Sequence, residues 1–335
     1  MSTDNSRLTT TEITNLLTQY NQETMSICIS KHVLATVKDS EIRSLFEFAL
    51  ELSGEHLKKL KEIFNNVNFP VPNGFTGKDV NLDAPPLFTD SFWLYYLHTM
   101  TNHGLSGYSI AFGVSTRLDI RNYYYQCNID AMEVYNKCID IFLSKGIYEK
   151  PPYFSTPQKV EYISNVGYVL DMFGKKRPLN SAESGNIFFN LTKSRLAKGV
   201  ILGFSQVAKD KDVREFFEKS LSTINKNFGV FSSLLREENL HIPQTLDTQV
   251  TNCTIAPFSD KLMMLKVGFM YGAAISYYST AMVSSLRADL VGHYEAAIIR
   301  SLKGLPNWWN IVIKNGWLEK LPPANDREDI GNCSK

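Results

Sequence analysis

A glutamate and a histidine, Glu23 and His56, are the residues of this sequence whose types and spacing could do chemistry. They lie at equal distances on either side of a short charged break at residues 38–41, each in a stretch with apolar residues at helical spacing. If these stretches are antiparallel helices, a rise of about 1.5 Å per residue puts both side chains at one height, about 25 Å from the turn. An imidazole beside a carboxylate could ligate a metal ion or form a buried hydrogen-bonded pair.

The metal hypothesis is a redox protein with a mononuclear site for iron, zinc or manganese in the first half of the chain. Its predicted ligands are Glu23, His56 and His103, because the third predicted helix brings His103 to about the same height. Asp130 and Glu133 reach that height on the fourth predicted helix, but we interpret their polar neighbours as a solvated stripe. The alternative is a histidine–carboxylate pair that satisfies two buried polar groups without a metal.

The elements that must position these residues occur twice in the sequence. The segment VKDSEIR at 37–43 reappears as AKDKDVR at 208–214, an offset of 171 residues. Further matching segments keep the same order over most of each half, with the offset falling to 170 after the second predicted helix. Such spacing indicates a tandem duplication. The equivalents of Glu23 and His56 are Ser194 and Asn227, so both members of the pair change together.

Each repeat reads as helix, turn, helix, long connection, helix, turn, helix. In the first repeat the predicted helices cover residues 10–36, 41–63, 90–115 and 120–144. The connection at 67–86 is rich in proline and glycine, and it is long enough to run the whole length of a helical bundle. This pattern predicts an all-α fold of two tandem ferritin-like four-helix bundles related by internal duplication. The predicted domains are a first bundle at 8–146, a linker at 147–178 that packs on the bundles, a second bundle at 179–323 and a flexible tail at 324–335.

A dinuclear iron centre would need more ligands than either predicted bundle provides. Helical di-iron proteins use four carboxylates and two histidines, with Glu-x-x-His on each of two helices. The residue three positions before His56 is Ser53, and the second repeat has Ile224 and Asn227 at these positions. There is also no glycine-rich phosphate loop, GxSxG or HExxH motif. The sequence therefore favours a non-enzymatic structural or interaction component, with no catalytic residue and no certain cofactor.

Composition and charge limit the classes of partner. The net charge of +1 and the lack of a basic block argue against nucleic-acid binding. Five cysteines form no CxxC pair and the polar N-terminus shows no signal peptide, which together favour a cytoplasmic protein. Residues 91–116 are uncharged and long enough to span a bilayer, but their histidines, asparagine and hydroxyl groups favour a buried central helix. We therefore expect no membrane span.

The third helix of the second repeat carries small residues at four-residue steps: Gly268, Gly272, Ser276 and Thr280. Small side chains let two helix backbones approach closely. We predict helix packing at this face, at the interface between the bundle halves or between subunits, so that a second copy or another protein partner could bind here. A lipid or other hydrophobic ligand held between the bundles near this face is a third hypothesis.

Short motifs along almost the whole chain connect it with a known group of proteins. They are LSGEHL at 52–57, NFPVP at 68–72, LSKG at 143–146, KPPY at 150–153, FGKKRPL at 173–179, GFSQVA at 203–208, PFSDKLM at 257–263 and IKNGWLE at 313–319. With these motifs the chain resembles an uncharacterised family of tandem ferritin-like proteins of spore-forming bacilli, distantly similar to spore coat protein F. The resemblance implies the helical fold and a sporulation or stress setting. It implies no chemistry, because none of the motifs carries a known catalytic role.

Overall fold

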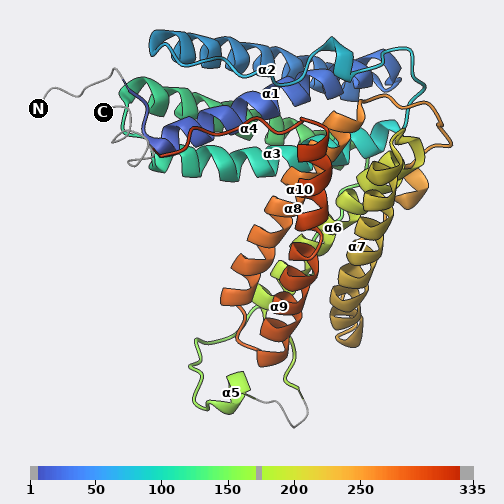
Figure 1. Cartoon of the computed structure of the whole chain (residues 1–335). Coiled ribbons are helices and arrows are strands. Elements are labelled where there is room, and N and C mark those ends of the chain that lie inside the picture. The colour runs from blue at the N-terminus through green and yellow to red at the C-terminus, as the bar shows by residue number, and fades with distance from the viewer. Residues whose placement is uncertain (1–6, 171–175, 325–335) are drawn as a thin grey trace, which may run out of the picture.

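The computed structural model describes residues 7–170 and 176–324, and its halves repeat one plan (Figure 1). The helices of the first half are α1 (Thr10–Thr36), α2 (Ser40–Asn66), α3 (Asp90–Gly113) and α4 (Leu118–Ser144). The helices of the second half are α6 (Ser181–Val207), α7 (Lys211–Glu237), α8 (Asp260–Val283), α9 (Ala288–Leu302) and α10 (Leu305–Lys314). A short helix α5 (Gly167–Leu170) lies between the halves, and the 3-10 turns η1 (Gly77–Asp79) and η2 (Asp247–Gln249) lie in the long connections.

The prediction of an all-α fold made by tandem duplication is confirmed. Helices dominate both halves, and the described residues contain no strand beyond two isolated bridges. The connectivity within each half, two hairpins joined by one long crossover, is the feature on which the ferritin-like expectation rests. The predicted domain boundaries stay a prediction.

The sequence sets the helix ends with the same devices in both halves. Thr9 and Asn180 cap α1 and α6, each in a capping box with a glutamate three residues later. Those glutamates, Glu12 and Glu183, are fully buried, and each also accepts two backbone N–H groups at the start of the fourth helix of its half. The glutamates thus fix the height of α1 against α4 and of α6 against α9.

The two long connections pair with each other about an approximate two-fold axis. Val80 forms an antiparallel bridge with Phe258, and Phe88 forms one with Val250. The two bridges are equivalent, because Val250 is the repeat counterpart of Val80 and Phe258 is that of Phe88, both at an offset of 170 residues. The segment that follows the last helix of each half also crosses to the other half. Glu149 accepts a hydrogen bond from the Gln244 backbone N–H, and its equivalent Glu319 accepts one from the Asn73 backbone N–H. The two halves therefore make reciprocal contacts through equivalent segments, as the subunits of a symmetric dimer do.

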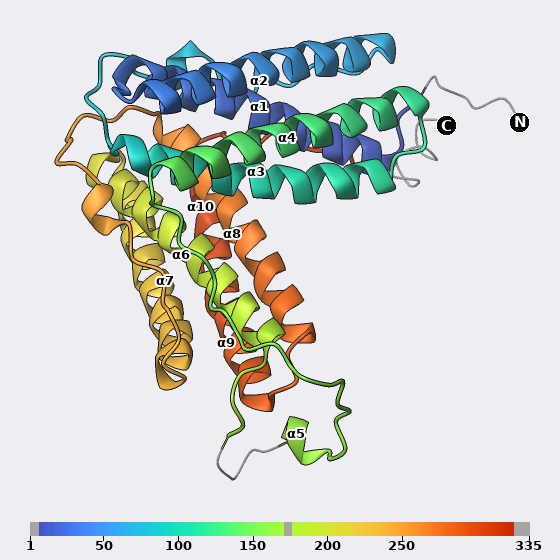
Figure 2. The same cartoon turned by 180° about the vertical axis from the view of Figure 1, so that it is seen from behind.

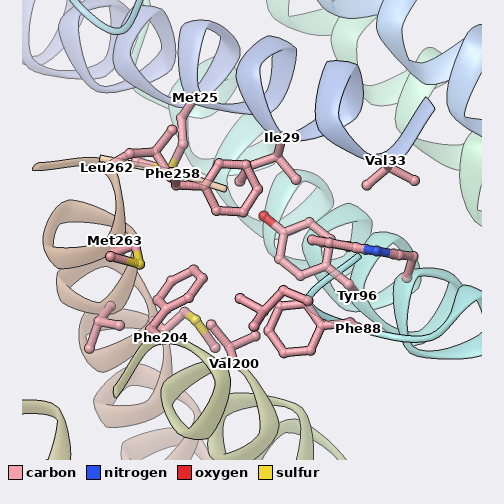
Figure 3. Packing of buried hydrophobic residues seen from close by; sticks show 14 of the residues in the cluster. Met25, Ile29, Val33, Phe88, Tyr96, Val200, Phe204, Phe258, Leu262 and Met263 are labelled. Carbon is pink, nitrogen blue, oxygen red and sulfur yellow. The ribbon is translucent and has the colours of Figure 1, made fainter. Parts of the chain in front are cut away.

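One apolar core continues through both halves (Figure 3). Met25 and Ile29 of α1 lie beside Phe258 and Leu262 across the boundary between the halves. On the opposite side, Phe88 and Phe92 pack directly against glycines of α6, where added Cβ atoms at Gly203 and Gly199 would lie 2.6 Å and 2.5 Å from ring carbons. Figures 1 and 2 show the resulting shape, in which the bundle α1–α4 lies across one end of the second half.

The second half departs from the repeated plan at its last helix. α4 is continuous over 27 residues, whereas its counterpart ends at Leu302 and restarts at Leu305 as α10. Gly304 and Pro306 explain this break, since proline lacks the amide hydrogen and clashes with the carbonyl four residues earlier. Trp308 of α10 then covers Gly268, where an added Cβ would lie 2.4 Å from the indole ring.

Two sequence expectations need correction. The predicted packing of the linker holds only near its start, where Ile147 and Tyr148 contact the core, because side chains from 153 to 167 are exposed. The small-residue face of α8 does not lie between the halves. Gly268 contacts α10 of its own half, while Gly272, Ser276 and Thr280 are exposed in this chain.

Some expectations fall on residues outside the described ranges. The predicted flexible tail lies there from residue 325, as does the start of the FGKKRPL motif. Within residues 7–170 and 176–324, no helix combines the length and apolar character that crossing a bilayer requires.

Candidate functional site

The structure joins Glu23 and His56 directly and adds a third residue, Asp130. His56 Nδ1 lies 2.9 Å from Oε1 of Glu23, and His56 Nε2 lies 2.8 Å from Oδ2 of Asp130. Only 4% of Glu23 and 8% of each of the other two residues is exposed. We call Glu23, His56 and Asp130 the ion network.

Neighbouring side chains hold the ion network in position. Gln19, one turn before Glu23 on α1, donates to the same carboxylate oxygen, and Tyr108 of α3 donates to it at 3.4 Å. Gln126 of α4 donates to the second oxygen of Asp130 at 2.8 Å. The rings of Tyr108 and Tyr123 lie edge-to-face with the imidazole. All four helices of the first half therefore contribute to the site.

This geometry fits a charged imidazole between two carboxylates. A carboxylate accepts hydrogen bonds and donates none, so a histidine between two carboxylates carries a hydrogen on both nitrogens. Burial opposes the charge, but contacts with the Cys127 side chain and the Glu23 carboxylate outweigh it and raise the pKa of His56 to about 11. Two carboxylates and one imidazolium give the ion network a net charge of −1.

As arranged, the ion network does not fit the predicted metal site. Glu23 and Asp130 lie at opposite nitrogens of one ring, so neither nitrogen has a free lone pair for a metal. His103 forms no hydrogen bond with the ion network within the described residues; it lies against Tyr277 of α8. Burial and the nearby Lys193 and Lys266 lower the pKa of His103 to about 3. In the described part of the chain, no group of three or more histidine, cysteine, aspartate or glutamate side chains is placed to hold a metal ion.

One Glu-x-x-His spacing does occur in the sequence, from Glu238 to His241. It lies where α7 ends and the second long connection begins. Glu238 accepts hydrogen bonds from the Leu179 backbone and the Arg287 side chain, and His241 packs on the ring of Phe188. Both residues therefore have structural partners in the second half.

A cavity of about 330 Å³ opens beside the ion network. Most of its wall is apolar and comes from all four helices of the first half, with Ile29, Phe46, Leu97 and Val134 among the lining residues. α8 of the second half closes the cavity with Lys266, Phe269 and Met270. Exposed Thr18 and Gly107 also line it, so the cavity reaches the surface between α1 and α3. A volume of this size matches the lower range of small-molecule sites.

The equivalent place in the second half is nearly filled. There a cavity of about 40 Å³ is lined by Asn190, Ser194, Asn227 and Tyr278, the counterparts of Gln19, Glu23, His56 and Tyr108. Arg300, the counterpart of Asp130, donates from Nε to Oδ1 of Asn227 at 2.7 Å. The oxygens of Ser194 and Tyr278 lie 3.3 Å apart. The second site thus holds one cation and no carboxylate where the first holds the ion network.

These features define an all-α tandem-repeat protein with a ligand-sized cavity in one of its halves. Residues 1–160 and 168–330 each match the family described as "Protein of unknown function (DUF3231)". The chain belongs to this family and contains two copies of its domain. No curated protein matches the chain.

Among solved structures, the chain is similar to a protein described as a "putative spore coat protein" from Bacillus halodurans C-125. The two are 14% identical with a TM-score of 0.41, and the match covers 45% of this chain and 98% of that one. The matched protein therefore has about the length of one half of this chain.

Proposed function

We propose that this protein is a non-enzymatic binding protein whose first half holds a small, largely apolar molecule. The observation that carries the proposal is the difference between the cavities, about 330 Å³ in the first half and about 40 Å³ in the second. Both lie at equivalent positions, so the fold alone does not require the larger one. Its apolar wall with a few converging polar groups is typical of sites for small ligands.

The chemistry of the ion network supports binding over catalysis. A general acid or base works best when its pKa lies near the working pH. Contacts with the Cys127 side chain and the Glu23 carboxylate raise the pKa of His56 to about 11, which leaves it protonated at neutral pH. The ion network therefore suits a fixed polar wall of the cavity.

The cavity can be tested by narrowing it. Ala49 lines the large cavity and Ala274 lines the small one, so Ala49→Leu and Ala274→Leu form a matched pair. We expect calorimetric titration with decanol to show binding to the unmodified chain and to Ala274→Leu, and weaker binding to Ala49→Leu. Absence of decanol binding to the unmodified chain, or equal binding to all three proteins, would contradict the proposal.

Metal binding through Glu23 and His56 remains the second candidate function, and it would require their hydrogen bond to open. Elemental analysis of untagged protein tests it. Stoichiometric iron, zinc or manganese that is lost in Glu23→Ala would replace the binding proposal for this site.

The setting that we propose, cytoplasmic and related to sporulation, rests on sequence composition and on the sequence resemblance to coat-type proteins. Imaging of a fluorescent fusion in sporulating cells tests that setting.

A further inference from the structure

One wall of the large cavity contains a buried amine that has no acidic partner. Lys266 of α8 is only 5% exposed, although a lysine is almost never buried without a counter-charge. Its Nζ donates to Sδ of Met100 at 2.7 Å and lies 4.9 Å from the centroid of the Tyr96 ring. A thioether sulfur is a weak acceptor and an aromatic face is a weak counter-charge. No carboxylate within the described residues pairs with Lys266.

Such a lysine lowers the stability of the folded chain. Removing an ammonium group from water costs free energy unless a paired charge and hydrogen bonds compensate. The cost is visible in the ionisation of the group, because burial lowers the pKa of Lys266 to about 7. Position 96, the two-fold equivalent of 266, holds a tyrosine in the same core. The fold therefore accommodates an uncharged side chain at this place, and packing does not explain the lysine.

The cavity has different chemistry at its two ends. Lys266 lies beside Met100, whereas the ion network lies beside Tyr108, eight residues further along α3. A helical rise of 1.5 Å per residue separates these levels by about 12 Å. Apolar side chains such as Leu97, Val134 and Phe269 line the space. The carboxylates at one end already share the cation of His56, while the amine at the other end has no anion.

We propose that Lys266 pairs with the carboxylate of a small monocarboxylic acid whose hydrocarbon body fills the large cavity. This inference rests on the proposed binding function and names the ligand class. The carboxylate would supply the hydrogen-bond acceptor and the negative charge that Lys266 lacks. A phosphate, with a second negative charge, would need further cations, and His103, which also lines the cavity, is neutral.

Titration of the full chain with three ten-carbon probes tests the assignment. Decanoic acid, decanol and decylamine share a hydrocarbon body and differ in the end group. We expect decanoic acid to bind at least about tenfold more tightly than decanol, since hydrogen bonds between charged groups are roughly twice as strong as those between neutral groups. Lys266→Met should abolish this preference while keeping decanol binding. Lys193→Met is the matched control because Lys193 is a buried lysine that lines the small cavity, and it should keep the preference.

Two sets of results separate failure of the inference from failure of the binding function. Equal binding of decanoic acid and decanol, strongest binding of decylamine, or an unchanged preference in Lys266→Met would overturn the role of Lys266 and leave the cavity proposal standing. No binding of decanol to the unmodified chain would overturn both. Thermal melting establishes that Lys266→Met is folded, and Lys266→Gln serves as the second variant if it is not.

Discussion

The two halves of this protein place the same backbone plan around two very different interiors. In the first half Glu23, His56 and Asp130 form a buried ion network beside a cavity of about 330 Å³. In the second half Ser194, Asn227 and Arg300 occupy the equivalent positions, and only about 40 Å³ remains open. The comparison shows that a shared helix order does not decide whether a repeat encloses a large cavity, since the inward-facing side chains at equivalent positions differ.

The largest expected effect is on the ion network. His56→Ala leaves two buried carboxylates without a cation and should lower the free energy of unfolding by about 3–5 kcal/mol. Asn227→Ala at the equivalent position removes one hydrogen bond to Arg300 and should cost about 1–2 kcal/mol. Urea unfolding of the full chain measures both. Equal losses would show that the two sites are energetically alike.

Removing the unpaired lysine should have the opposite sign. Lys266→Met should stabilise the chain at pH 7 by a few kcal/mol, at about 1.4 kcal/mol for each unit of pKa shift. The folded-state pKa, about 7, lies below the unfolded value, 10.5, so the cost of Lys266 disappears as pH rises towards 10.5. Its neighbours Tyr96 and His103 stay neutral over that range, since burial raises the pKa of Tyr96 and lowers that of His103. Melting temperatures of both proteins should therefore converge at high pH, and a constant difference would contradict this account.

The glycines of α8 distinguish packing from exposure. An alanine at Gly268 would place its Cβ 2.4 Å from the Trp308 ring, so Gly268→Ala should cost about 1–3 kcal/mol. Gly272 has open space around its Cβ direction, so Gly272→Ala should stabilise the helix by up to about 1 kcal/mol. Thermal unfolding measures both variants. A loss of stability or a change in oligomeric state in Gly272→Ala would instead indicate that a partner covers this face.

The dependence of stability on pH sharpens the comparison further. The triple variant Glu23→Ser, His56→Asn, Asp130→Arg gives the first half the residues of the second. His56 has a folded-state pKa of about 11 against an ordinary value of 6.5, so its contribution is complete below pH 6.5 and is lost as pH rises through 11. The stability advantage of the unmodified chain over this variant should fall by at most about 1.4 kcal/mol per pH unit in that window. A flat difference would show that His56 is not held as the imidazolium.

Most of the fold could be predicted because its signals are local. The threonine cap of α1, the aspartate caps of α2 and α7 and the apolar stripes place helix ends within a few residues. The break between α9 and α10 was not predicted, although Gly304 and Pro306 signal it in the sequence. The exposure of the linker could not be predicted, because apolar residues such as Tyr162 and Ile163 predict burial wherever they occur.

The site could be predicted in part, for geometric reasons. Equal distances from the turn were enough to pair Glu23 with His56. Asp130 was assigned to a solvated stripe because Gln126 and Glu133 flank it, although its spacing from Cys127 and Val134 puts it on the buried side of α4. The burial of Lys266 had no local signal. It depends on Tyr96 and Met100, which approach only when the two halves pack.

The approximate two-fold axis explains how Lys266 can exist at all. In an assembly of two identical chains, each position near the axis carries the same residue twice, and a change that suits one copy is imposed on the other. Here positions 96 and 266 are symmetry mates that touch, yet one is a tyrosine and the other a lysine. When the two copies are joined in one chain, their equivalent positions can carry different residues. One repeat can then specialise while the other supports its structure.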